Sequence, residues 1–106
     1  MDSDKLFGSY IKTDDVKEPV ETEIVGVKIG TFGSEHDSEQ KLLVSFKGFD
    51  KPLVLNKANQ ESIKAIVGSA ETDDWIGAKM VLFTDPNVMY GGKRVGGVRV
   101  RGVEDA

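Results

Sequence analysis

Cysteine is absent from the 106 residues of the chain. A disulfide framework and thiolate metal sites are therefore excluded, and the composition fits a reducing, cytoplasmic compartment. No apolar run approaches the roughly 18 residues that a membrane span needs, and the N-terminus lacks the basic-then-apolar pattern of a signal peptide. We therefore expect one cytoplasmic domain, since about 100–150 residues is the usual size of a single domain.

Residue types that commonly carry catalysis are scarce. His36 is the only histidine, and no serine or cysteine constellation accompanies it. Asp73 and Asp74 are adjacent, and since adjacent side chains usually diverge, a turn or helix start is the favoured interpretation. The glycines of YGGKRVGG match no nucleotide-binding spacing. The sequence predicts a binding module without cofactor or metal; the alternative is a metal-dependent hydrolase or nuclease using Asp73 and Asp74.

Negative charge exceeds positive charge, and the two are unevenly distributed. The net charge is −4, which on average disfavours a partner made of phosphates. Residues 1–40 hold ten acids and four lysines, whereas residues 75–103 hold five cations and one acid, Asp85. A basic face on an acidic protein is therefore possible, and the alternative is an ordinary mixed, solvated surface.

Alternating apolar and β-branched residues indicate five strands. In the first of them Val25, Val27 and Ile29 are expected on one side, and its glycines indicate curvature or a bulge. The fourth and fifth strands are expected to meet through a Gly91-Gly92 turn. The expected strands span residues 21–32, 41–48, 51–57, 78–84 and 94–100, the last extended to Val103.

The periodicity changes to that of a helix after the third strand. Ile63, Ile66 and Val67 share one face, Asn56 is a plausible N-cap and Gly68 supplies a left-handed C-terminal residue. This order predicts a mainly β fold, a five-stranded OB-type Greek-key barrel with one helix between strands 3 and 4. An SH3-like or other small barrel is the alternative. We expect residues 1–19 to form an acidic N-terminal arm and residues 20–106 a single domain.

The predicted fold indicates where a ligand would bind. OB barrels bind single strands across strands two and three and the adjoining loops, through aromatic platforms and cations. The Gly91-Gly92 turn would place Thr84 opposite Arg99 and direct Phe83 into the core. The predicted stacking residues are Phe49 and Tyr90, and the predicted phosphate contacts are Lys47, Lys57, Lys93, Arg94, Arg99 and Arg101. We expect single-stranded DNA binding with weak sequence preference.

An acidic loop opposes this interpretation. SEHDSEQ carries three acids and no lysine or arginine, and in an OB barrel this loop would flank the groove. A protein partner would meet no such repulsion. The alternative function is therefore a protein-interaction or structural module of a phage assembly that binds no nucleic acid.

One half of the chain resembles a group of small phage and prophage proteins. The resemblance covers about residues 51–101 and rests on Leu55-Asn56-Lys57, the TDDWIG segment, Gly91-Gly92-Lys93 and the Val98–Arg101 segment. It implies a phage or prophage origin, hence the host cytoplasm, and a role near nucleic-acid metabolism. Another phage or replication protein is the expected partner if the acidic loop repels nucleic acid. It supplies no active site. We expect Asn56 and Trp75 to be structural, since their side chains can satisfy or cover backbone.

Overall fold

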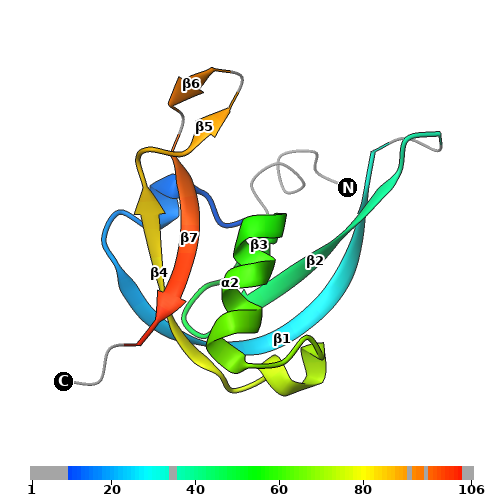
Figure 1. Cartoon of the computed structure of the whole chain (residues 1–106), viewed down its shortest axis with the longest axis vertical. Coiled ribbons are helices and arrows are strands. Elements are labelled where there is room, and N and C mark those ends of the chain that lie inside the picture. Colours follow the sequence, from blue (N-terminus) through cyan, green and yellow to red (C-terminus); the bar gives the residue numbers. More distant parts are fainter. Residues whose placement is uncertain (1–9, 34–35, 91, 95, 104–106) are drawn as a thin grey trace.

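The computed structural model describes residues 10–33, 36–90, 92–94 and 96–103. They form a mainly β fold with an antiparallel five-stranded sheet, a separate two-stranded hairpin and one α-helix (Figure 1). The elements are η1 (Thr13–Asp15), β1 (Val20–Phe32), β2 (Glu39–Phe46), β3 (Leu53–Val54), α2 (Lys57–Val67), η2 (Thr72–Trp75), β4 (Lys79–Asp85), β5 (Met89–Tyr90), β6 (Lys93–Arg94) and β7 (Gly97–Gly102). No helix of the described residues is both long and apolar enough to span a membrane.

The sheet has the order β3-β2-β1-β4-β7 and remains open. The long strand β1 connects its two parts, because residues 20–23 pair with β4 and residues 24–32 pair with β2. A closed barrel would require β3 to pair with β7, and no such ladder joins the described parts of the two strands. The third strand is also shorter than predicted: only Leu53 and Val54 form a ladder with β2 before the chain turns into α2.

A β-bulge in β1 changes which residues face the core. The pairing with β2 shifts between Ile24 and Gly26, as the glycines of this strand predict. Because of the extra residue, Ile24 is fully buried and Val27 packs against the core, while Val25 is 53% exposed. The prediction that Val25 shares a face with Val27 was therefore wrong, since strict alternation does not continue through a bulge.

The segment before β1 lies against the open side of the sheet. Ile11 donates its backbone N–H to the carbonyl of Pro52 at 2.9 Å, beside β3. Further along, the hydroxyl of Thr84 in β4 donates to the carbonyl of Val16 at 2.6 Å. Ile11 and Val16 are 6% and 0% exposed and belong to the hydrophobic core. This segment, predicted as part of an arm, thus contributes two core side chains.

Asp15 holds this segment through two contacts of one carboxylate oxygen. Oδ2 accepts hydrogen bonds from Lys51 Nζ at 2.9 Å and from the backbone N–H of Lys12 at 2.8 Å. The Lys51 hydrogen bond first, and the Lys12 N–H second, lower the pKa of Asp15 below its ordinary value of 3.8. Since the folded-state pKa is depressed, the stabilisation is present above about pH 4 and is lost as the pH falls through the lower folded-state value.

Asp15→Asn is therefore expected to reduce stability at pH 7 and to have no effect at pH values well below 3.8. The loss should not exceed about 1 kcal/mol, because the pair is exposed to solvent. Urea unfolding of both proteins at neutral and acidic pH measures the difference. Asp14→Asn removes the same charge at the neighbouring exposed residue and is the matched control. An Asp15→Asn effect that persists unchanged at low pH would contradict the ion-pair explanation.

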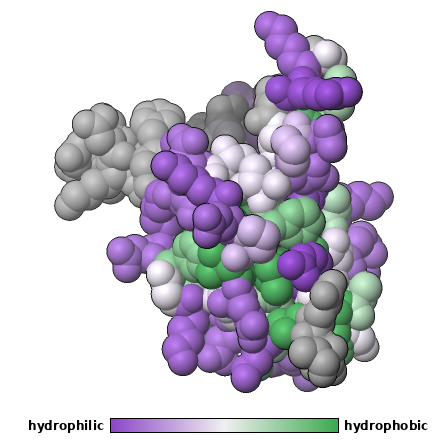
Figure 2. Space-filling model, turned by 90° about the vertical axis from the view of Figure 1, so that its left-hand side faces the viewer, coloured by the Kyte–Doolittle hydropathy of each residue, from purple (hydrophilic) through white to green (hydrophobic). Residues whose placement is uncertain are grey.

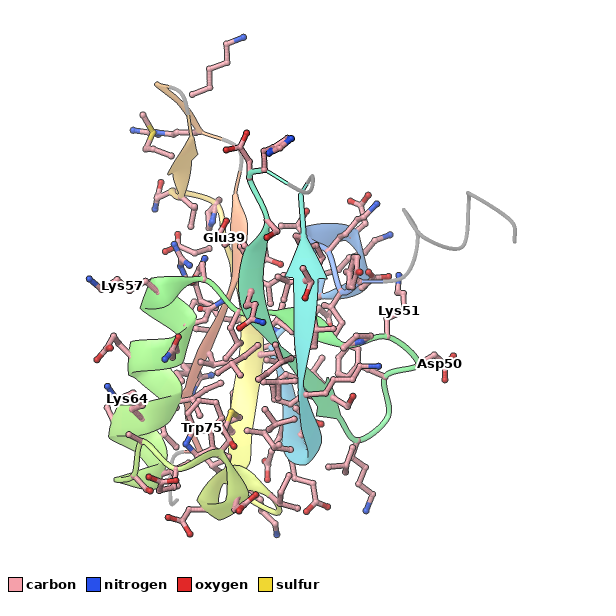
Figure 3. All side chains as sticks on the ribbon, turned by 90° about the vertical axis from the view of Figure 1, so that its right-hand side faces the viewer. Glu39, Asp50, Lys51, Lys57, Lys64 and Trp75 are labelled. Atoms are coloured by element: carbon pink, nitrogen blue, oxygen red, sulfur yellow. The ribbon has the colours of Figure 1, made fainter. Side chains whose placement is uncertain are left out.

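Helix α2 begins and ends where the sequence predicts. The Asn56 side chain accepts a hydrogen bond from the backbone N–H of Asn59, and Gly68 ends the helix with φ of 79°. Ile63, a residue of α2, is fully buried in the hydrophobic core. After α2, the short helix η2 directs Trp75 into the core, where its indole N–H donates to the carbonyl of Ser69 at 2.9 Å (Figure 3). Ile76, the next residue along the chain, is 50% exposed.

The connection between β4 and β7 contains the hairpin β5–β6. Tyr90 pairs with Lys93, which is the pairing that the predicted Gly91-Gly92 turn implies. In the main ladder, however, Thr84 pairs with Val98 and Phe83 with Arg99, one residue away from the predicted register. Three residues separate β4 from β5 but only two separate β6 from β7, so the hairpin register does not continue into the longer strands. Phe83 is consequently half-buried and shares a face with Arg99, so its prediction as a core residue was wrong.

Candidate binding groove

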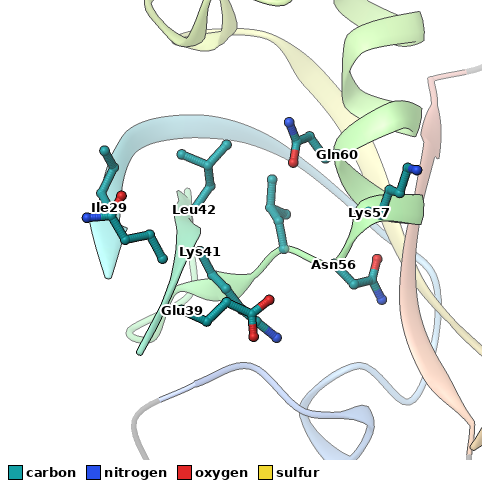
Figure 4. Close-up of a pocket in the computed structure, with 9 residues that line it drawn as sticks. Ile29, Glu39, Lys41, Leu42, Asn56, Lys57 and Gln60 are labelled. Atoms are coloured by element: carbon teal, nitrogen blue, oxygen red, sulfur yellow. The ribbon is translucent and has the colours of Figure 1, made fainter. Parts of the chain in front are cut away.

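A groove of about 580 Å³ opens between the start of β2 and the first turn of α2. It forms because β2 continues beyond its pairing with β3: Leu43 and Val44 form that ladder, and Leu42 accepts one further backbone hydrogen bond from Leu55. Before Leu42 the strand runs on along β1 while the chain on the other side turns into the helix. Figure 4 shows side chains of β1 and β2 on one side and those of α2 on the other.

The lining of the groove combines apolar contact with positive charge. Leu42, Leu55 and the 66%-exposed Ile29 supply apolar surface. Lys41 and Lys57 contribute one cation from each wall, and Glu39 contributes one anion. Three side-chain amides complete the lining: Gln40, Asn56 and Gln60. Such a surface can hold a ligand that has flat apolar parts, hydrogen-bonding edges and negative charge.

Only one of the eight residues predicted from the sequence, Lys57, lies in this groove. Lys93 and Arg94 are exposed on the hairpin β5–β6, which projects from the body of the protein (Figure 1). Tyr90 lies in β5, and its side chain is outside the described part of the structure. These three residues form a group separate from the groove.

Lys47 and Phe49 follow the opposite end of β2. The ammonium of Lys47 lies 3.5 Å from a carboxylate oxygen of Glu23 and is highly exposed. Phe49 is half-buried and packs against the hydrophobic core, so its ring does not form an exposed stacking platform. Neither residue is near the groove.

Arg99 and Arg101 lie on the same face of β7 but differ in exposure. Arg101 is exposed and lies opposite Val81. Arg99 is half-buried, and its Nη1 atom is inaccessible to solvent, with no hydrogen-bond partner among the described residues. Figure 2 shows the side of the protein that carries β4 and β7, where hydrophilic side chains surround a limited apolar area. A continuous stripe of exposed cations on this strand is not formed.

The residues considered for catalysis are dispersed. Asp74 accepts a hydrogen bond from the hydroxyl of Ser69 at 2.6 Å, which fixes the turn before η2, while Asp73 is exposed on η2. His36 is exposed in the loop between β1 and β2. Within the residues that the structure describes, no group of three histidine, aspartate or glutamate side chains is placed to hold a metal ion.

The sequence interpretation missed most of the groove. Lys41 opens a predicted strand and resembles an ordinary solvated lysine, and Gln60 lies on the polar side of the predicted helix. The usable signal was Asn56: a helix that begins there places Lys57 and Gln60 on its first exposed turn. That β2 would face this turn depends on tertiary pairing.

No protein-family model matches the chain, and neither a curated protein nor a solved structure matches it.

Proposed function

We propose that this protein is a small OB-type module that binds single-stranded DNA in the groove between β2 and α2. The observation that carries the proposal is the groove lining, in which Lys41 and Lys57 stand on either side of apolar surface from Leu42 and Leu55. Proteins that bind single strands combine positive charge along the backbone path with flat surfaces for the bases. Contacts of this kind read little base identity, so sequence preference should be weak.

The strand order supports the OB-type assignment. In an OB fold, five strands form a partly open Greek-key barrel, and the surface of strands two and three binds oligonucleotides together with two loops. The order β3-β2-β1-β4-β7, with α2 between the third and fourth strands of the sheet, agrees with that topology. The groove borders the second strand, β2, as the assignment requires.

The hairpin β5–β6 would contribute the second part of the interface. It stands where an OB fold has the loop between its last two strands, and it carries the exposed cations Lys93 and Arg94. Tyr90 would stack on a base there, and Arg101 would contact phosphate further along β7. Glu39 opposes a phosphate backbone at the rim of the groove, so affinity should be moderate and strongly dependent on salt.

The biological setting belongs to the same proposal. The resemblance of the segment around TDDWIG supports a phage- or prophage-encoded protein acting in the host cytoplasm, with another replication protein as a further partner. In this proposal the protein is a binding module without cofactor and not an enzyme.

Fluorescence anisotropy of a labelled poly-dT oligonucleotide tests the proposal. At about 50 mM salt we expect micromolar or tighter binding, which weakens at about 200 mM because binding releases counterions from the strand. The same titration with duplex DNA gives the comparison, since the groove offers no element for reading a duplex. Absence of poly-dT binding at the lower salt concentration would refute the function.

A protein-binding module is the second candidate function. Val25 and Ile76 are 53% and 50% exposed, and they lie on neighbouring segments because Gly77 donates its N–H to the carbonyl of Ile24. Exposed aliphatic side chains that lie on neighbouring segments are typical of protein contacts. Light scattering decides whether the protein forms a stable oligomer. An oligomer that dissociates in a Val25→Ser/Ile76→Ser variant would favour this candidate.

A further inference from the structure

A second hollow of about 430 Å³, the slot, lies between the two edges of the open sheet. β3 and β7 border it, the N-terminal segment crosses it at Ile11–Thr13, and the start of α2 closes one end. Leu53, Val54, Val88 and Val98 supply apolar walls. Asn56 lines both this slot and the groove, so the two sites adjoin at the N-terminus of the helix.

Asn59, which lines this slot, holds a buried oxygen atom without a hydrogen-bond partner among the described residues. The residue is 2% exposed, and its Nδ2 donates to the carbonyl of Val98 at 2.9 Å. Since a carbonyl only accepts hydrogen bonds, the amide nitrogen must face Val98 and Oδ1 must face the other way. Oδ1 has no accessible surface and no hydrogen-bond partner among the described residues.

Arg99 supplies the complementary group. It lines the same slot, and its Nη1 is also inaccessible to solvent and without a partner in the described part of the chain. Buried polar groups in proteins nearly always have a hydrogen-bond partner. Leaving a buried donor without one costs free energy, and the cost is larger when the donor belongs to a charged group. Two residues that line one slot thus each hold a buried polar atom with no partner among the described residues, the acceptor Asn59 Oδ1 and the cationic donor Arg99 Nη1.

We propose that this slot binds one base of the single strand, which rests on the proposed function. The base would donate an N–H to Asn59 Oδ1 and accept a hydrogen bond from Arg99 Nη1, with its faces against Leu53, Val54 and Val98. Each nucleobase carries a donor beside an acceptor on its edge, so occupancy does not require one particular base. The strand backbone would lie in the groove, and the base would turn past Asn56 into the slot.

The edge acceptors that are already occupied favour a base over an inserted peptide strand. The carbonyls of Pro52 and Val98, which a further strand would need, already accept hydrogen bonds from Ile11 N–H and Asn59 Nδ2. The lining atoms without a hydrogen-bond partner among the described residues belong to the side chains of Asn59 and Arg99. Neither atom touches solvent, so a base would reach them only after side chains that line the slot move aside.

Arg99→Met tests the slot, with Arg101→Met as the matched control on the same strand. Methionine retains the length and the apolar stem of arginine and removes the unpartnered donor, so the variant should fold. We expect Arg99→Met to weaken poly-dT binding about 10-fold, since hydrogen bonds to charged groups are the stronger kind. Arg101→Met, which removes one exposed phosphate contact, should weaken it less than about threefold. If Arg99→Met destabilises the fold, Arg99→Lys provides the second variant.

A modified ligand separates the slot from the groove. An oligonucleotide of 3-methylthymine retains the backbone and the rings but lacks the N–H that Asn59 Oδ1 would accept. It should bind the wild type about 10-fold more weakly than poly-dT, with no additional loss in Arg99→Met. Equal affinity of wild type and Arg99→Met for poly-dT would overturn the slot while leaving the proposed function intact.

Nucleoside titrations cover the case in which no oligonucleotide binds. Thymidine, but not 3-methylthymidine, should shift the Asn59 side-chain amide resonances in NMR spectra of the full chain. That result without oligonucleotide binding would support the slot and refute the proposed function. An absence of thymidine shifts at millimolar concentration, or shifts from an acetylated and amidated tetravaline peptide instead, would overturn the base slot.

Discussion

Replacing Trp75 with alanine is expected to lower the free energy of unfolding by about 3–5 kcal/mol, the usual cost of truncating a buried tryptophan. Trp75 is 1% exposed and belongs to the hydrophobic core, to which the sheet and α2 both contribute side chains. Its indole N–H also donates to the carbonyl of Ser69, so truncation leaves a cavity and removes that hydrogen bond. Since a domain of this size is stable by about 5–15 kcal/mol, this single change would remove a large part of the total.

Urea unfolding followed by far-UV circular dichroism measures this loss, because Trp75 is the only tryptophan and the variant has no tryptophan fluorescence. Ile76→Ala is the matched control: it truncates the next residue of the TDDWIG segment, whose side chain is 50% exposed. Its effect should stay within about 0.5 kcal/mol. Trp75→Phe should fall between the two, because it retains most of the buried surface but leaves the Ser69 carbonyl without its donor.

Equal effects of Trp75→Ala and Ile76→Ala would contradict this assignment. A cost of less than about 1 kcal/mol for Trp75→Ala would mean that the segment is not anchored by its aromatic side chain. Binding of poly-dT by Trp75→Ala at a temperature where it remains folded should equal that of the wild type, since Trp75 does not line the groove.

Features with local causes could be predicted from the sequence. The ends of α2 follow from Asn56 and Gly68, whose capping roles need only neighbouring backbone. The Tyr90–Lys93 pairing follows from a short glycine turn. Each of these is set by a few consecutive residues, so residue type alone carries the information.

Features that depend on distant pairing could not be predicted. The bulge after Ile24 reverses the face of Val25, and glycines indicate a bulge without fixing its position. The register between β4 and β7 shifts because the two connections to the hairpin differ in length. β3 forms a ladder with β2 over only two residues, and the N-terminal segment, far away in the sequence, lies beside its start through the hydrogen bond from the Ile11 N–H to the Pro52 carbonyl.

The groove shows the same division. Lys57 was among the predicted phosphate contacts as the last residue of the expected third strand, and in the structure it is the first residue of α2. Lys41 was not, because its importance depends on β2 running past β3 toward that turn. Charge counting indicated where cations are frequent in the chain, namely residues 75–103, but Lys93, Arg99 and Arg101 reach different surroundings in the fold.

Reversing both groove cations, as Lys41→Glu/Lys57→Glu, is expected to weaken poly-dT binding about 100-fold at low salt. A charge pair at 4 Å in water is worth about 1 kcal/mol, so exchanging attraction for repulsion at two positions changes binding by up to about 4 kcal/mol. Screening reduces this to about 3 kcal/mol, and each 1.4 kcal/mol is a factor of ten. The salt dependence should also weaken, since each lost phosphate contact lowers the slope for single strands by about 0.7.

The matched control is Lys47→Glu/Lys79→Glu, which produces the same change in net charge away from the groove. These two lysines line a separate shallow site beside Glu21 and Glu23, whose acids already disfavour phosphate. Binding should fall less than about threefold, by the change in overall charge alone. Anisotropy titrations of both variants at matched salt give the comparison, after circular dichroism confirms that each is folded.

The contrast between the two variants shows where the single-stranded DNA lies on the protein. A large loss of poly-dT affinity in the groove variant with a small loss in the control requires phosphates near Lys41 and Lys57. Both variants have the same net charge, so the long-range electrostatic attraction is equal in the two and does not explain a difference. The reverse result would place the strand at the far end of β2, where Lys47 was predicted to contribute. Equal losses would mean attraction by overall charge without a defined path, and the groove would then be no binding site for nucleic acid.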